Sequence, residues 1–141
     1  MTRAFRSVYR FWAMLIAVAV LTQVGLAGYG AFNGDHKANV AGSVTHKAFD
    51  HGFDPHIALG WLLLLGTLVL FLLSAAARLG KKGILRSLGL FLLVLLAVIL
   101  AAFGGDHPIV GIFHPIDGFA ILALAGFNAR VSWTGRATPR P

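Results

Sequence analysis

HIALGWLLLLGTLVLFLLSAAARL, residues 56–79, decides the fold class of this chain. A single helix needs roughly 20 apolar residues to cross the hydrocarbon core of a bilayer, and this run is long enough. Three more apolar runs cover about residues 11–32, 84–105 and 114–133. Because lipid offers no partner for backbone polar groups, separate runs of this length cross it only as helices. We therefore predict four transmembrane helices.

The composition supports the same conclusion. The chain has 141 residues, of which 57% are hydrophobic and only 12% charged, with a mean hydropathy of +0.79. A soluble domain of this size cannot bury so much apolar surface, so we expect one all-α integral membrane domain over residues 1–141. The chain has no cysteine. This excludes disulfides, iron–sulfur clusters, covalently attached c-type haem and thiolate nucleophiles.

The distribution of charge predicts the orientation. Ten of the twelve Lys and Arg residues lie before residue 11, between 78 and 86, or after 129, and only Lys37 and Lys47 lie in the expected outer loop 33–55. The positive-inside rule then places both termini in the cytoplasm. The basic pI reflects this topology, so no nucleic-acid partner is expected. All five acidic residues and all six histidines fall on the outer side, where we expect any chemistry to take place.

The connections suggest an antiparallel bundle built from two similar hairpins. The second and third runs are joined by a short Gly80–Lys81–Lys82–Gly83 stretch, which we interpret as a tight turn. The first helix ends in LAGYGAF before His56, and the third ends in LAAFGG before His114. Two like hairpins in the same orientation imply a pseudo-twofold axis along the membrane normal.

Two stretches share the pattern His-x-x-x-Gly-aromatic. They are HIALGW, which starts at His56, and HPIDGF, which starts at His114. On helical wheels, the first histidine shares a face with Thr67 and Ser74, and the second shares one with Asn128. Polar groups of membrane helices normally face the bundle interior. We therefore expect His56 and His114 to face each other at similar depth, near the outer side.

This pair predicts a haem site. Two histidines on facing helices hold haem iron axially without any cysteine. Gly60 and Gly118, one turn deeper, leave room for a flat macrocycle, and Asp117 is placed to orient a ligand histidine. The alternative is structural. Each histidine is then a hydrated interfacial residue, the glycines permit close helix packing, and Asp117 caps the helix start.

The layout resembles a family of small bacterial four-helix membrane proteins of unknown function. It is more distantly similar to the four-helix haem-binding units of b-type cytochromes and of haem A synthase. The resemblance covers about residues 11–133 and rests on His56-x-x-x-Gly60 and His114-x-x-x-Gly118. It implies a multi-pass protein of the bacterial cytoplasmic membrane that binds haem b on its outer side and transfers electrons, or supports haem, within or beside a respiratory complex.

Other interpretations remain open. A cofactor-free accessory subunit would pack against other membrane subunits or a second copy of itself. A metal-dependent enzyme would use the outer His and Asp residues, among which His46 and Asp50 stand four positions apart. Gln23, near mid-membrane, makes either an interhelical hydrogen bond or a contact to a quinone. The sequence contains no nucleophile–base set, phosphate-binding loop or HExxH motif, so catalysis has no specific support.

Overall fold

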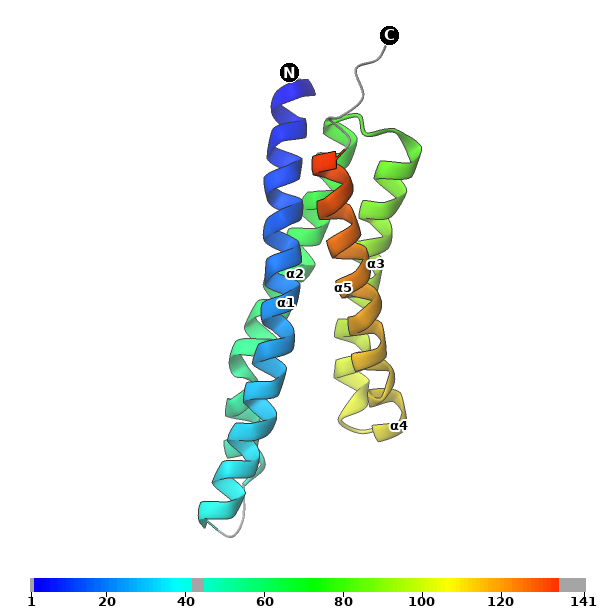
Figure 1. The fold of residues 1–141 in the computed structure, drawn as a ribbon. Helices are drawn as coiled ribbons and strands as arrows, with labels where there is room; N and C mark the ends of the chain where they lie inside the picture. The colour runs from blue at the N-terminus through cyan, green and yellow to red at the C-terminus, as the bar shows by residue number, and fades with distance from the viewer. Residues whose placement is uncertain (1, 42–44, 135–141) are drawn as a thin grey trace.

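The computed structural model describes residues 2–41 and 45–134, without the side chains of residues 41, 46–48 and 50. Within these residues the chain consists of helices joined by short turns, as Figure 1 shows, and contains no strand. The helices are α1 (Thr2–Ala41), α2 (His46–Ala76), α3 (Gly80–Gly104), α4 (Pro108–Gly111) and α5 (Phe113–Thr134). The all-α expectation is confirmed.

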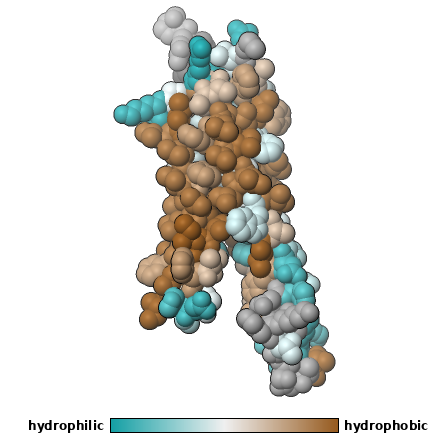
Figure 2. Space-filling model, turned by 180° about the vertical axis from the view of Figure 1, so that it is seen from behind, coloured by the Kyte–Doolittle hydropathy of each residue, from teal (hydrophilic) through white to brown (hydrophobic). Residues whose placement is uncertain are grey.

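Within the part of the chain that the structure describes, four helical segments are long and apolar enough to cross a membrane. They cover Thr2–Val40, His51–Ala76, Gly80–Gly104 and Pro108–Thr134. Apolar side chains cover most of the surface in Figure 2, and polar ones gather toward the two ends of the molecule. This is the surface expected of a multi-pass protein whose helices contact lipid.

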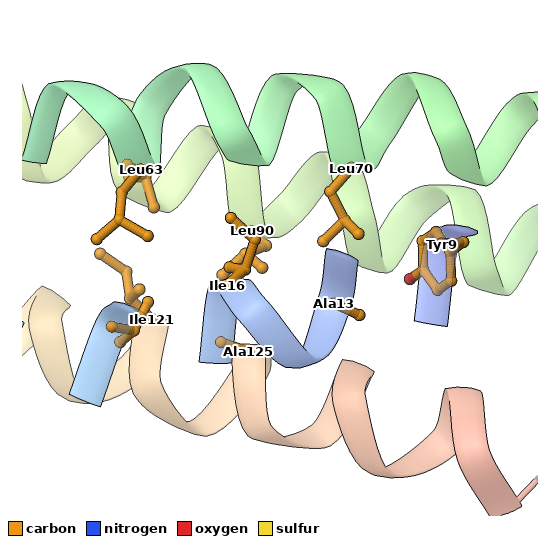
Figure 3. Packing of buried hydrophobic residues seen from close by; sticks show 10 residues of the cluster. Tyr9, Ala13, Ile16, Leu63, Leu70, Leu90, Ile121 and Ala125 are labelled. Carbon is orange, nitrogen blue, oxygen red and sulfur yellow. The ribbon is translucent and has the colours of Figure 1, made fainter. Parts of the chain in front are cut away.

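The long helices pack side by side in pairs. Helix α1 contacts α2 and α5, and α3 also contacts α2 and α5, while the short α4 lies between α3 and α5. All four long helices contribute to one apolar core, part of which is shown in Figure 3. Its most buried members include Leu70 of α2 and Leu90 of α3.

The inward faces predicted for the second and fourth runs are the buried ones. Thr67 and Ser74 of α2 are completely buried, and so is nearly all of Asn128 of α5. Thr67 donates to the Leu63 carbonyl at 2.8 Å and Ser74 to the Phe71 carbonyl at 2.6 Å. These two hydroxyls are therefore satisfied within their own helix.

The expected outer loop 33–55 is instead mainly helical, because α1 continues to Ala41 and α2 begins at His46. Glycines explain this difference. A Cβ added at Gly30 would lie 2.6 Å from the Phe53 ring, and one at Gly34 would lie 2.5 Å from the Phe49 ring. Helices α1 and α2 thus continue past the apolar run as a closely packed pair. The aromatic rings of α2 pack directly against the glycine backbone of α1.

The predicted turn at Gly80–Gly83 is also wrong, because this stretch forms the first turn of α3. The turn comes earlier. The Leu79 amide donates to the Ser74 carbonyl at 3.2 Å, and the Arg78 amide donates to the Ala75 carbonyl at 3.0 Å. This is a Schellman motif, with Arg78 in the left-handed position at φ 51°. Local backbone bonding therefore ends α2 before the glycines are reached.

Candidate functional site: two histidines between the hairpins

His56 of α2 and His114 of α5 lie close together although they belong to different hairpins. In Figure 1 the lower part of α1 and α2 lies apart from the lower part of α3 and α5, and Figure 2 shows the same two lower ends from behind. The imidazole centroids lie 6.1 Å apart, with the ring planes at 72° to each other. The structure thus brings the two sequence-predicted histidines together.

Each histidine is held by a backbone carbonyl of the other helix in its hairpin. His56 Nδ1 donates to the Gln23 carbonyl of α1 at 3.2 Å, and His114 Nδ1 donates to the Ala97 carbonyl of α3 at 2.9 Å. The two hairpins therefore repeat the same interaction, in which a histidine of the second helix is bound to the backbone of the first.

These bonds determine the chemistry of the rings. A carbonyl oxygen only accepts hydrogen bonds, so Nδ1 carries the proton in both neutral rings. Nε2 is then left with a lone pair. Histidines that bind metals commonly donate their other ring nitrogen to a backbone carbonyl or carboxylate, which fixes the tautomer and the ring orientation.

The Gln23 side chain strengthens the first hairpin. Its Nε2 donates to the His56 carbonyl at 2.7 Å, so Gln23 and His56 bond each other in both directions. This is the interhelical hydrogen bond that the sequence allowed as one interpretation of Gln23. The Gln23 Oε1 atom is buried without a partner.

A cavity of about 420 Å³ adjoins the two histidines. Its walls are almost entirely apolar, with small side chains on α3, and its few polar groups include Gln23, His56 and His114. Ile57 and Trp61 also line the cavity and are about half exposed, so it opens at the protein surface. Its size is within the range of about 300–1,000 Å³ found for ligand pockets.

The remaining sequence-predicted site residues differ in position. Gly60 lines the cavity, and a Cβ added there would lie 3.3 Å from Gln23 Nε2. Gly118 has open space around it and is not part of the cavity wall. Asp117 is 8% exposed, with Oδ2 buried and unpartnered, but it also lies outside the wall.

The outer polar residues do not assemble around a metal ion within the described part of the chain. No group of three or more His, Asp or Glu side chains there is able to hold one. His51 and Asp54 form an exposed pair at 2.9 Å. The side chains of His46 and Asp50 lie outside the described residues.

Two histidines are enough to bind a metal whose remaining donor atoms belong to a cofactor. A haem supplies four equatorial nitrogens, so only axial positions are left to the protein. With metal–imidazole bonds of about 2 Å on opposite sides of one ion, two ring centroids would lie about 6 Å apart. The observed separation is 6.1 Å, and the apolar walls suit a macrocycle. The residues present are therefore of the kinds that would hold haem b, with His56 and His114 as the protein ligands.

No protein-family model, curated protein or solved structure matches the chain. The site residues are therefore assigned from geometry and chemistry alone.

Sequence reasoning missed the α3 wall of the cavity. Ala97 contributes its backbone carbonyl, and because every residue has one, the sequence does not show this role. Ala97 and Ala101 both line the cavity and stand four positions apart in a helix otherwise rich in larger side chains. That small-residue spacing was the one available signal.

Proposed function

We propose that this chain is a small b-type haem protein of the membrane, with His56 and His114 as axial ligands. The observation that carries the proposal is the pairing of two carbonyl-oriented imidazoles, 6.1 Å apart, beside an apolar cavity. A bound haem would supply one-electron transfer at its iron. The role we assign is electron transfer or haem support within or beside a larger redox complex.

The chain's own residues would do three things at such a site. The Gln23 and Ala97 carbonyls hold the Nδ1 protons and thereby present Nε2. Gly60 and the small α3 side chains leave space against the helix backbones. The apolar side chains of the cavity wall would contact the apolar faces of the macrocycle.

The proposal includes an orientation. We place the four helices as an antiparallel bundle in the bacterial cytoplasmic membrane, with both termini in the cytoplasm. The end that contains Arg6, Arg78 and Arg130 is the basic one, while the aspartates lie toward the opposite end. The histidine pair then lies on the outer side of the membrane.

An absorption spectrum of the purified protein tests the function directly. The chain is expressed with ample haem precursor, purified in mild detergent and measured oxidised and reduced. We expect a Soret band that shifts on reduction and sharp visible bands typical of low-spin haem. A protein that stays colourless under these conditions refutes the proposal.

A second candidate is a cofactor-free accessory subunit, and one observation favours it. The Nδ1 atoms of both histidines and the Gln23 amide already have partners in the neighbouring helix, so these residues also serve to join the helices. Gly25, Gly28 and Gly126 have open space around them. Such bare surfaces allow the close approach of a helix from another subunit or a second copy.

A further inference from the structure

A second cavity, far from the histidines, lies at the opposite end of the helices. It has a volume of about 390 Å³ and lies where α1 and α3 begin and α2 and α5 end. Four arginines line it: Arg6 and Arg10 of α1, Arg78 of the turn after α2, and Arg86 of α3. Segments distant in sequence thus bring four positive charges to one concave site.

Among the described residues, no acidic side chain lines this cavity. The five acidic residues of the chain are Asp35, Asp50, Asp54, Asp106 and Asp117. None belongs to the wall of this cavity. Four guanidinium groups without a carboxylate repel one another, and an anion between them would relieve the repulsion.

Several donors in and around the cavity have no acceptor. Arg10 Nη1 and Arg86 Nε are buried without a hydrogen-bond partner. Asn128 of α5 also lines the cavity, is only 2% exposed, and has both its Nδ2 and Oδ1 atoms unpartnered. A buried donor without an acceptor is costly, so a native protein normally provides one. An oxyanion would supply acceptors for all three donors.

Other contacts position the arginines without neutralising them. Arg6 Nε donates to the Ala77 carbonyl at 3.2 Å. The Arg86 guanidinium carbon lies 5.3 Å from the centroid of the Phe127 ring. Both contacts fix a side chain and leave its charge intact.

The turn before α3 places Arg78 in the wall of this cavity. Arg78 occupies the left-handed position of the Schellman motif, with φ 51°. Glycine is the usual residue there, because a Cβ makes this conformation unfavourable. An arginine at this position costs local stability, and its side chain forms part of the cavity wall.

We propose that this cavity binds a phosphate group, supplied by an anionic lipid headgroup or by a soluble phosphate. Arginine forks match phosphate oxygens in geometry and charge, and Asn128, which also lines the cavity, adds a neutral donor. Basic pockets between membrane helices bind anionic headgroups at the side where basic residues gather. This site does not depend on the haem proposal, because no residue lines both cavities.

Ligand binding to the full-length chain in an uncharged detergent tests the proposal. Native mass spectrometry and thermal stability are measured with phosphatidylglycerol, with inorganic phosphate, and with zwitterionic phosphatidylcholine as the control. Stabilisation by phosphatidylglycerol alone assigns the site to lipid. Stabilisation by inorganic phosphate, with competition against the lipid, assigns it to a soluble phosphate. Binding of neither above the phosphatidylcholine level overturns the proposal.

Two pairs of variants locate the site. Arg10→Gln with Arg86→Gln should weaken binding at least about tenfold, since each arginine provides a charge-assisted bond. Lys81→Gln with Lys82→Gln is the matched control, because it removes the same charge from exposed positions outside the cavity wall. Equal losses in the two pairs would mean general charge attraction and would overturn the site.

Asn128→Ala separates ligand binding from folding. If Asn128 serves the ligand, this variant loses ligand-induced stabilisation while the ligand-free protein is as stable as the wild type, since its buried amide has no partner to lose. If the ligand-free variant is destabilised and still binds phosphate normally, Asn128 is structural and the proposal fails.

Discussion

His56 and His114 lie on the second helix of their respective hairpins, α2 and α5, and their imidazole rings lie 6.1 Å apart. Each ring donates Nδ1–H to a carbonyl of the first helix of its own hairpin. Each hairpin therefore orients one imidazole ring. The two rings come together only when the hairpins pack against each other. Binding of one ligand by both histidines therefore requires that the two hairpins pack correctly against each other.

The first prediction concerns the two histidines. His56→Ala and His114→Ala should each abolish the low-spin haem spectrum, because each removes one of the two axial bonds. His36→Ala and His107→Ala are matched controls, since both are exposed residues outside the cavity wall, and should leave the spectrum unchanged. Absorption spectroscopy of the four purified variants checks this. An unchanged low-spin spectrum in His114→Ala would show that the ligand assignment is wrong.

The second prediction concerns space beside the rings. Gly60→Leu should lower haem affinity by roughly ten- to a hundredfold, because overpacking costs about 1–3 kcal/mol and Gly60 lines the cavity. Gly118→Leu should bind haem like the wild type, since Gly118 has open surroundings outside the wall. Haem titration followed by absorption gives both affinities. Equal losses in the two variants would count against the cavity as the binding site.

Much of the fold was predictable because the membrane constrains it so strongly. The four apolar runs and the inward stripe through Thr67 and Ser74 follow from length and helical period. The extension of α1 and α2 over residues 33–55 did not follow. It depends on the packing of the Phe49 ring against Gly34 and of the Phe53 ring against Gly30. A single sequence does not show which glycine contacts which ring.

The candidate sites were predictable only in part, for a related reason. The recurrence of His-x-x-x-Gly identified His56 and His114, and helical period placed them on inward faces. Gly118 was expected to leave room for the macrocycle but lies outside the cavity wall, whereas Gly60 lines it. The arginine cavity needs three-dimensional contacts, since its four arginines come from three separate parts of the sequence.

The third prediction concerns orientation. The chain has no cysteine, so single cysteines report topology cleanly. His36→Cys should react with a membrane-impermeant thiol reagent in intact cells, whereas Lys82→Cys should react only after lysis, because basic residues are retained in the cytoplasm. Both positions are exposed, so both should label in broken cells. Labelling of Lys82→Cys alone in intact cells would reverse the topology and place the histidines on the inner side.

The fourth prediction separates the Gln23 side chain from its backbone. Gln23→Leu removes the 2.7 Å bond from Nε2 to the His56 carbonyl but keeps the Gln23 carbonyl that orients the His56 ring. Interhelical hydrogen bonds in membranes contribute about 0.6 kcal/mol on average and up to about 1.7 kcal/mol. The free energy of unfolding should therefore fall by about 1 kcal/mol, while the haem spectrum of the folded protein stays that of the wild type.

Thr22→Val is the control for that variant. Thr22 is exposed and donates only to the Val18 carbonyl of its own helix at 3.0 Å, so its loss should leave stability nearly unchanged. Reversible unfolding in mixed detergent micelles measures both free energies. Equal stability of the two variants would mean that the Gln23 bond contributes nothing between α1 and α2. A lost spectrum in folded Gln23→Leu would mean that the side chain itself contacts the bound group, contrary to a purely interhelical role, because the bond that orients His56 comes from the backbone and survives the substitution.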